Sequence, residues 1–204
     1  MLFASGLSAA TATALTATPA AAVTVPGAPS GWTTVFSDSF SGAAGSAPSA
    51  QNWFYDIGTG YGNNEVEQTT NSPSNIYRDG NGHLVIQAND TAGAWTSAKI
   101  ESTRDDFQAP AGGELEMTAS IQQSNPAGPL GYWPAFWALG APLRTTGSWP
   151  QAGEIDMLED INGHNLASQN LHYGSNGQSG PRWSACPNNG STCQTGYHTY
   201  TVLI

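Results

Sequence analysis

From Gly31 onward the sequence consists of short runs in which apolar and polar residues alternate, with no amphipathic helical pattern of about 10 to 15 residues. The runs are TTVFSDSF, HLVIQAN, SAKIEST, GELEMTASIQQ, YWPAFWALG, GEIDMLE, ASQNLHYG and YHTYTVLI. Turn-forming pairs separate them, including Asp79-Gly80, Asn81-Gly82, Asn162-Gly163 and Asn189-Gly190. The pattern predicts one all-β domain built of two stacked antiparallel sheets.

The charge of the chain narrows the classes of partner. Its formal net charge is −10, which argues against nucleic acid or an anionic membrane as partner and fits a neutral substrate better. No segment beyond the N-terminal stretch approaches the roughly 18 consecutive apolar residues of a membrane span. We therefore expect neither a nucleic-acid nor a membrane partner.

The ends of the chain suggest how it is organised. Residues 1–22 carry no charge and end in three alanines, which predicts a secretory signal and an extracellular protein; a disordered Ala/Thr tail is the alternative. Residues 23–30 form a short linker, and residues 31–204 form the domain. The last run places His198, Tyr200, Val202 and Ile204 on one face and stops in mid-strand, so we expect the domain to be incomplete at its C-terminus.

The two cysteines of the chain, Cys186 and Cys193, bracket the turn-rich hexapeptide PNNGST. In a secreted chain this spacing predicts a local disulfide. Closing so short a loop stabilises by roughly 2–3 kcal/mol on the chain-entropy account. Without a cluster of His and Cys residues, a zinc site is not expected.

Three carboxylates lie close together in the segment GEIDMLED, at Glu154, Asp156 and Glu159. On a regular strand Glu159 points away from the other two, and a regular helix also separates the three. A β-bulge that adds one residue at Met157-Leu158 returns Glu159 to the face of Glu154 and Asp156. The spacing therefore predicts either a bulged strand or an irrelevant third acid.

Aligned in this way, the acids suit glycoside hydrolysis. Two glutamates of a bulged strand can bring their carboxyl groups to about 5–5.5 Å, the separation found in retaining glycosidases. Asp156 between them can hydrogen-bond the nucleophile and bias which carboxyl group holds the proton. An ordinary solvated acidic face is the alternative. The apolar neighbours Ile155, Met157 and Leu158 indicate a central strand, where repulsion among three acids is accepted mainly at functional sites.

Tryptophans supply a second element of a sugar site. Trp133, Ala135 and Trp137 alternate onto one face, and Trp149 lies just upstream of Glu154. Indole rings stack on the apolar faces of pyranose rings and donate one hydrogen bond. The alternative, that these rings fill the core, is favoured for Trp137 and stays open for Trp133 and Trp149.

The order of these motifs resembles glycoside hydrolase family 16, in particular its bacterial laminarinase-like branch, the endo-β-1,3-glucanases. The segments that carry the resemblance are FSDSF, YGNNEVEQTT, DGNGHLVIQA, TSAKIEST, GYWPAFWALG, WPQAGEIDMLE, LHYG and HTYTV. They extend over about residues 32 to 204 and are specific in combination. The family pattern normally continues past HTYTV into a tryptophan and several more strands, so the resemblance also implies that residues 31–204 are a partial catalytic domain.

The resemblance implies a concanavalin A-like β-jelly-roll sandwich with a substrate cleft on its concave sheet. It makes Glu154 the nucleophile, Glu159 the general acid/base and Asp156 the assisting carboxylate of a retaining mechanism. The positions that match sugar-contacting residues are Asn64, Trp133, Trp149 and His172. For His172, a core histidine bonded to backbone is an equal alternative.

The same resemblance bears on cofactors. It implies that no cofactor is required and no metal takes part in catalysis. Many members bind a structural calcium ion on the convex side, although no ligand set for it is legible in this sequence.

These inferences make the chain a secreted, monomeric, endo-acting hydrolase of β-1,3-glucan of the laminarin type, with a polysaccharide as its substrate. As a fragment it is expected to have reduced stability, and an inactive fragment is one outcome. One alternative is a non-catalytic β-glucan-binding module on the same jelly roll. Another is a relative that acts on mixed-linkage glucan or galactan, or that transglycosylates, because linkage preference lies in the loops that shape the cleft.

Overall fold

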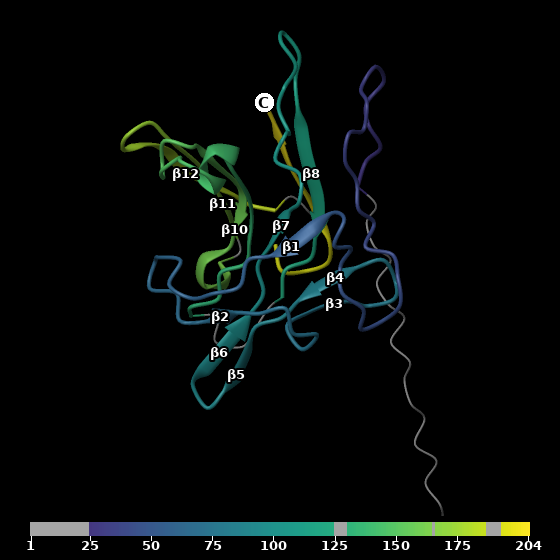
Figure 1. Ribbon diagram of the computed structural model, residues 1–204, viewed down its shortest axis with the longest axis vertical. Coiled ribbons are helices and arrows are strands. Elements are labelled where there is room, and N and C mark those ends of the chain that lie inside the picture. The colour runs from purple at the N-terminus through teal and green to yellow at the C-terminus, as the bar shows by residue number, and fades with distance from the viewer. Residues whose placement is uncertain (1–24, 125–129, 165, 187–192) are drawn as a thin grey trace, which may run out of the picture.

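The structure of the chain is a computed structural model that describes residues 25–124, 130–164, 166–186 and 193–204 (Figure 1). The secretory signal predicted over residues 1–22 lies outside the described residues, as does the turn predicted at Asn189-Gly190.

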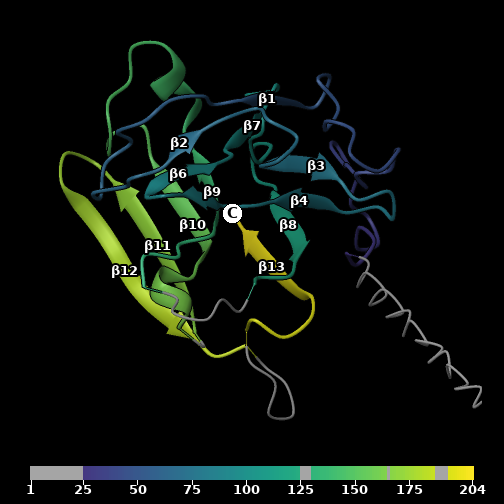
Figure 2. The ribbon, with the colours of Figure 1, turned by 90° about the horizontal axis from the view of Figure 1, so that it is seen from below.

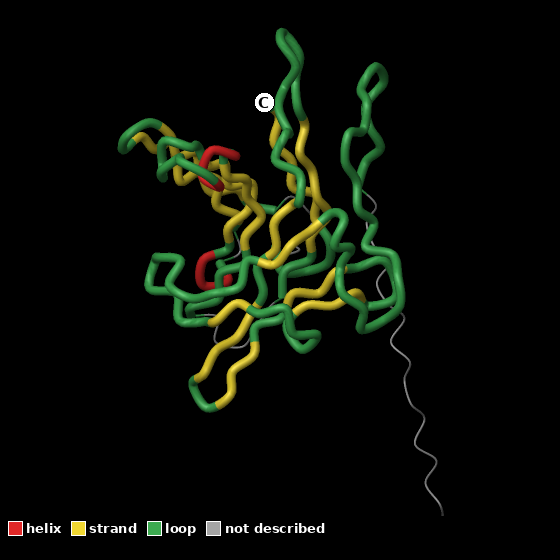
Figure 3. The backbone as a smooth tube through the Cα atoms, viewed as in Figure 1, coloured by secondary structure: helices red, strands yellow, loops and turns green. Residues whose placement is uncertain are grey.

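Strands are the dominant regular element of the described residues (Figure 3). They are β1 (Trp53–Tyr55), β2 (Gln68–Thr69), β3 (Ile76–Arg78), β4 (Leu84–Ile86), β5 (Asn89–Thr91), β6 (Ala94–Ser97), β7 (Ile100–Ser102), β8 (Glu116–Ile121), β9 (Ala135–Leu139), β10 (Glu154–Glu159), β11 (Ala167–Tyr173), β12 (Gly177–Ser184) and β13 (His198–Leu203). The helical elements within the same ranges are two short 3₁₀ turns, η1 (Ala141–Arg144) and η2 (Ile161–Gly163). Nowhere in the described part of the chain is a helix long and apolar enough to cross a membrane. The predicted all-β class is confirmed.

The largest sheet has four antiparallel strands in the order β12-β11-β10-β9, which lie side by side in Figure 2. Strand β13 pairs with β8, β1 with β7, and β3 with β4, all antiparallel. The group β2-β6-β5 includes one parallel pair, β2 with β6. The strands thus form smaller hydrogen-bonded groups than two continuous sheets, because several of them are only 2–4 residues long and are interrupted by turns.

The turn predicted around Asp79 joins β3 to β4. Gly80 and Gly82 adopt φ values of 88° and 87°, the left-handed region that glycine enters without steric cost. The Asp79 carboxylate accepts hydrogen bonds from the backbone N–H groups of Asn81 and His83, at 2.7 Å and 3.1 Å. Side chain and glycines together account for the tight reversal at this point.

Strand β13 shows the alternation predicted from its sequence. His198 and Tyr200 are buried, whereas Thr199 and Thr201 are exposed. Tyr200 contributes to the apolar core with the buried residues Leu158 of β10 and Ala167 of β11. Partly buried side chains from β8, β9 and the segment after β12 pack against this cluster: Ile121, Phe136 and Cys186. The core therefore anchors β10 and β11 from one face and leaves their other face for the acidic residues.

The predicted disulfide between Cys186 and Cys193 is present, with the two Cα atoms 5.0 Å apart. Cys193 is fully buried, and the Sγ atom of Cys186 lies 3.6 Å from the Tyr200 hydroxyl group. The bond therefore ties the segment that follows β12 to the core beneath β13.

Candidate active site

Strand β10 carries all three acids, and its pairing with both neighbours is irregular after Asp156. On β9, the residues opposite Asp156 and Glu159 are two positions apart, and the same is true on β11. Three steps along β10 therefore match two steps on each neighbour, which is a β-bulge. The predicted bulge at Met157-Leu158 is confirmed.

The bulge separates the two faces of β10. Leu158 is 1% exposed and packs in the core. Asp156 is 4% exposed at the floor of the opposite face, and Glu154 and Glu159 are half-buried on either side of it. We call this surface of β9, β10 and β11 the acid-bearing face.

Two tryptophans hold the outer acids. The Nε1–H group of Trp149 donates to Oε2 of Glu154 at 2.6 Å, and that of Trp133 donates to Oε1 of Glu159 at 2.9 Å. The two side chains are 55% and 37% exposed, so their rings stay accessible while their N–H groups are engaged. The structure thus brings both predicted tryptophans to the predicted acids. That they contact sugar stays a prediction.

His172 lies directly opposite Glu154 across the β10–β11 pair. Its Nε2 atom is 3.4 Å from Oδ2 of Asp156, and its ring centroid is 5.3 Å from the ring of Trp149. The histidine therefore belongs to the acid-bearing face, which was one of the two alternatives left open by the sequence.

Trp137 does not fill the core, contrary to the interpretation favoured from the sequence. It is half-buried and lies directly opposite Asp156, and directly opposite residues of an antiparallel pair project to the same face. Alternation along β9 alone does not tell which of its faces meets the acids, and the pairing of Trp137 with Asp156 decides it.

Asn170 is a site residue that the sequence reasoning missed. It lies opposite Asp156 on β11, and its Nδ2 atom donates a short hydrogen bond to Oε2 of Glu159. Both oxygens of Glu159 thus accept an N–H group, one from Trp133 and one from Asn170. The sequence could have indicated Asn170, because it lies two residues before His172 and residues two apart on a strand share a face.

The environment shifts two of the carboxyl groups toward the protonated form. Burial, the charges of Glu154 and Glu159, and a hydrogen bond with Glu154 raise the pKa of Asp156 to about 7. Burial also raises the pKa of Glu159, although the hydrogen bonds from Trp133 and Asn170 oppose the shift. Burial therefore favours the protonated form of Glu159.

The raised pKa of Asp156 predicts how stability depends on pH. Because the folded-state value of about 7 lies above the reference value of 3.8, the folded chain binds this proton more tightly than the unfolded chain. Ionised Asp156 therefore costs stability above pH 7, and the cost disappears as the pH falls toward 3.8. We expect Asp156→Asn to raise Tm by a few degrees at pH 8 and to leave it unchanged at pH 4.

Thermal unfolding at the two pH values checks this expectation. Glu116→Gln, which removes an exposed carboxylate at the start of β8, serves as the control for loss of one negative charge. A stabilisation by Asp156→Asn that is as large at pH 4 as at pH 8 contradicts the assignment.

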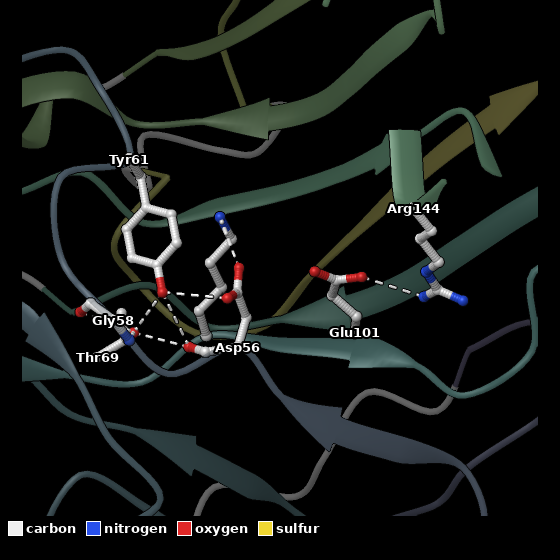
Figure 4. Close-up of polar contacts among 7 residues, drawn as sticks. Asp56, Gly58, Tyr61, Thr69, Glu101 and Arg144 are labelled. Atoms are coloured by element: carbon white, nitrogen blue, oxygen red, sulfur yellow. Dashed lines mark hydrogen bonds and ion pairs between the residues drawn. The ribbon is translucent and has the colours of Figure 1, made fainter. Parts of the chain in front are cut away.

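The loop that carries Trp149 is fastened to β7. Arg144, the last residue of η1, donates from Nη2 to Oε2 of Glu101 at 3.1 Å (Figure 4). The same Nη2 atom donates to the carbonyl oxygen of Ser102 at 2.7 Å. Its guanidinium group also lies 5.0 Å from the centroid of the Phe54 ring. These contacts hold the connection between β9 and β10, and with it the approach of Trp149 to Glu154.

Asn64 lies at an exposed turn in the β1–β2 loop, residues 56–67, with a left-handed φ of 60°. Within the described residues, no hydrogen bond or ion pair joins it to the three acids. Its predicted contact with sugar stays a prediction.

Potential metal ligands gather on the acid-bearing face. Glu154, Asp156 and His172 each offer one donor atom, and these atoms lie within 4.8 Å of one another. Calcium prefers about six to eight oxygen ligands, so two carboxylates with an imidazole do not fit the structural calcium implied by the resemblance. The calcium ion expected on the opposite face stays a prediction.

Residues 118–201 match the family model described as "XgeA-like, catalytic GH16 domain". The chain is similar to the crystal structure of an endo-1,3-beta-glucanase from Streptomyces sioyaensis, with 44% identity, a TM-score of 0.81, and coverage of 88% of this chain and 70% of the other. It is also similar to a laminarinase from Flavobacterium sp. UMI-01, with 30% identity, a TM-score of 0.58, and coverage of 80% and 67%.

Comparison by sequence agrees. A beta-glucanase from Rhodothermus marinus is 35% identical over 136 residues, which are 64% of this chain and 44% of that protein. The chain spans less than half the length of the curated relatives it matches. The solved relatives support the jelly-roll sandwich predicted for the fold.

Proposed function

The chain belongs to glycoside hydrolase family 16, and on this premise we propose that it is a secreted, endo-acting hydrolase that cleaves β-1,3-glucan with retention of configuration. The observation that carries the proposal is the bulge in β10, which aligns Glu154 and Glu159 on one face. Each of these glutamates accepts an indole N–H group from a tryptophan whose ring stays accessible to a sugar.

The first chemical step is attack on the sugar. The Glu154 carboxylate bonds to the anomeric carbon while protonated Glu159 gives its proton to the glycosidic oxygen, and the bond between that carbon and oxygen breaks. Trp149 stabilises the attacking carboxylate by its N–H group. Each oxygen of Glu159 has two lone pairs, so one N–H group on each leaves a position for the proton.

The second step reverses these roles. Glu159, now a carboxylate, takes a proton from water, whose oxygen bonds to the anomeric carbon as the ester bond to Glu154 breaks. Asp156, buried between them and with a raised pKa, exchanges a hydrogen bond with Glu154 and so helps to hold the nucleophile. Two displacements at the same carbon leave its configuration unchanged.

The choice of β-1,3-glucan is supported by the relatives of known structure, which are a glucanase and a laminarinase. The exposed rings of Trp133 and Trp149 are suited to a neutral pyranose chain, as is the net charge of −10. The disulfide and the uncharged residues 1–22 support secretion. We propose a monomer that needs no partner protein.

Anomer-resolved proton NMR during hydrolysis of a soluble β-1,3-glucan tests the mechanism. We expect the β-anomer of the new reducing end to form first and the α-anomer to follow only by mutarotation. Immediate formation of the α-anomer shows inversion and overturns the proposal.

A substrate panel tests the specificity with the same preparation. We expect faster release of reducing ends from β-1,3-glucan than from mixed-linkage glucan or galactan, and products of intermediate length at early times. Preference for a galactan overturns the substrate assignment and leaves the mechanism intact. Binding of β-1,3-glucan without any hydrolysis by the full-length protein identifies a binding module instead.

A further inference from the structure

Lys99 is the one lysine of the sequence, and it lies between β6 and β7. Its Nζ atom is 3.3 Å from Oδ2 of Asp56, at the start of the β1–β2 loop. The same atom lies 4.0 Å from the ring centroid of Tyr61, in the middle of that loop, and 4.9 Å from that of Trp137 on β9. A single ammonium group thus connects the loop with the sheet.

The base of the loop is closed by a separate set of hydrogen bonds. In Figure 4, Asp56, Gly58, Tyr61 and Thr69 point toward one another. The Tyr61 hydroxyl group is 3.1 Å from Oδ1 of Asp56 and 2.9 Å from Oγ1 of Thr69, and that threonine donates to the Asp56 carbonyl oxygen at 2.7 Å. The backbone N–H of Gly58 donates to the Thr69 hydroxyl group at 2.9 Å. These bonds shape the loop but contain no contact with β9.

The contact of Lys99 with Trp137 is what relates the loop to the site. Trp137 is directly opposite Asp156, so its ring belongs to the acid-bearing face. The ammonium group between the Tyr61 and Trp137 rings therefore sets the distance of the loop from that face, on the β9 side. An ammonium group over the face of an aromatic ring is attracted by that ring, so these two contacts draw the loop toward Trp137.

A role for Lys99 in binding an anionic sugar substituent fits these contacts poorly. Its charge is already paired with Asp56, its Nζ atom lies against two rings, and its side chain is 24% exposed. Glu65 of the same loop also interacts with this charge. The Lys99 ammonium group therefore interacts with groups of the protein itself and not with a substrate anion.

We propose that Lys99 is a positioning residue that holds the β1–β2 loop against Trp137 and thereby forms the β9-side wall of the substrate-binding face. The loop carries Asn64 and three of the chain's carboxylates, so its placement determines how a polymer lies beside the acids. Lys99 acts on binding of the glucan rather than on bond cleavage. The kinetic part of this proposal rests on the proposed function, whereas the structural part does not.

Lys99→Met and Lys99→Arg separate the charge from the length of the side chain. We expect Lys99→Met to raise KM for β-1,3-glucan about five- to tenfold and to leave kcat within about twofold, because the lost contacts fix a wall and not a reacting group. Lys99→Arg keeps a cation for Asp56 and both rings and should restore KM to within about twofold. If Lys99→Met lowers kcat and leaves KM unchanged, the proposal is contradicted.

Arg104→Met is the matched control. Arg104 also pairs with a carboxylate, that of Asp106 at 2.8 Å, and also lies over an aromatic ring, that of Phe107 at 4.7 Å. Its removal deletes the same kinds of contact from a different place. A rise in KM of equal size in this control shows a general loss of charge or stability and overturns the proposal.

Amide hydrogen exchange tests the structural part without any turnover. Lys99→Met should accelerate exchange in the middle of the loop, above all at Glu65, whose backbone N–H donates to the Gly62 carbonyl oxygen, and leave exchange in β10 and β11 unchanged. If glucan is not hydrolysed at all, this measurement still decides the role of Lys99. Wild-type exchange rates in the loop of Lys99→Met overturn the proposal.

Because the chain has one lysine, amine chemistry on the folded protein gives a second route should Lys99→Met fail to fold. Acetylation removes the charge of Lys99, whereas reductive dimethylation keeps it. Both reagents change the α-amino group in the same two ways, so acetylated Lys99→Arg, in which the α-amino group is the amine that reacts, serves as the control. Acetylated protein should show the accelerated loop exchange and dimethylated protein should not. Equal exchange in the two samples contradicts the proposal.

Discussion

We expect Glu154→Gln to lower the rate of reducing-end release from β-1,3-glucan by about a thousandfold or more, because the isosteric amide cannot attack as a nucleophile. The amide oxygen can still accept the hydrogen bond of Trp149 Nε1, so the loss reflects chemistry and not a rearranged site. Initial rates on a soluble glucan measure it directly.

The control for this variant is Glu116→Gln, which removes the same charge from the exposed start of β8 and should keep wild-type activity. An unchanged thermal transition shows that Glu154→Gln is folded. If folded Glu154→Gln retains a tenth of the wild-type rate, Glu154 is not the nucleophile.

We expect Glu159→Ala to lower turnover of the polysaccharide by about 10²- to 10⁴-fold, the usual contribution of general acid–base catalysis. The loss should be smaller for release of an acidic phenol from an aryl glycoside, because such a leaving group departs without a proton. The slow step is then attack of water on the glycosyl ester of Glu154, because the variant lacks the Glu159 carboxylate that would take the proton from that water. We therefore expect a burst of phenol followed by slow turnover.

Added azide distinguishes the two glutamates. Azide needs no deprotonation, so it should accelerate the slow phase of Glu159→Ala and yield a glycosyl azide of retained configuration. Glu154→Gln should show neither burst nor azide product by this route, since no glycosyl-enzyme forms. A burst from Glu154→Gln and none from Glu159→Ala reverses the two roles.

The alternation of residues made β10 predictable in some detail. Glu154 and Asp156 share a face on any strand, and only an inserted residue allows Glu159 to join them. The repulsion of three acids between apolar neighbours gave a reason to interpret the segment as a functional site. The disulfide was predictable because the two cysteines are close in sequence, as was the turn around Asp79 because glycine permits left-handed backbone.

The features that could not be predicted from the sequence depend on contacts between segments that are distant in the chain. The hydrogen bond of Asn170 to Glu159 follows from the register of β11 on β10, which no local pattern determines. Trp137 was assigned to the core because its apolar character suits either face, and only its pairing with Asp156 decides between them. The contacts of Lys99 join residues 38 or more positions apart, at Tyr61 and Trp137.

The grouping of strands also escaped prediction. Strands of two to four residues can pair in many ways at similar cost, so the parallel pairing of β2 with β6 could not be read from composition or alternation. The predicted runs located β8, β10, β11 and β13, each of six or seven residues, whereas the eight-residue strand β12 was not predicted.

The bulge in β10 has a consequence for how this strand can change over evolutionary time. Elsewhere in a sheet, deletion of one residue turns every following side chain to the opposite face. At Met157-Leu158 a deletion instead converts the bulge into regular pairing, and the second glutamate still follows the aspartate on the same face. At this point, unlike its neighbours, β10 can lose a residue and keep the three acids on one face, at the cost of one buried side chain, Met157 or Leu158.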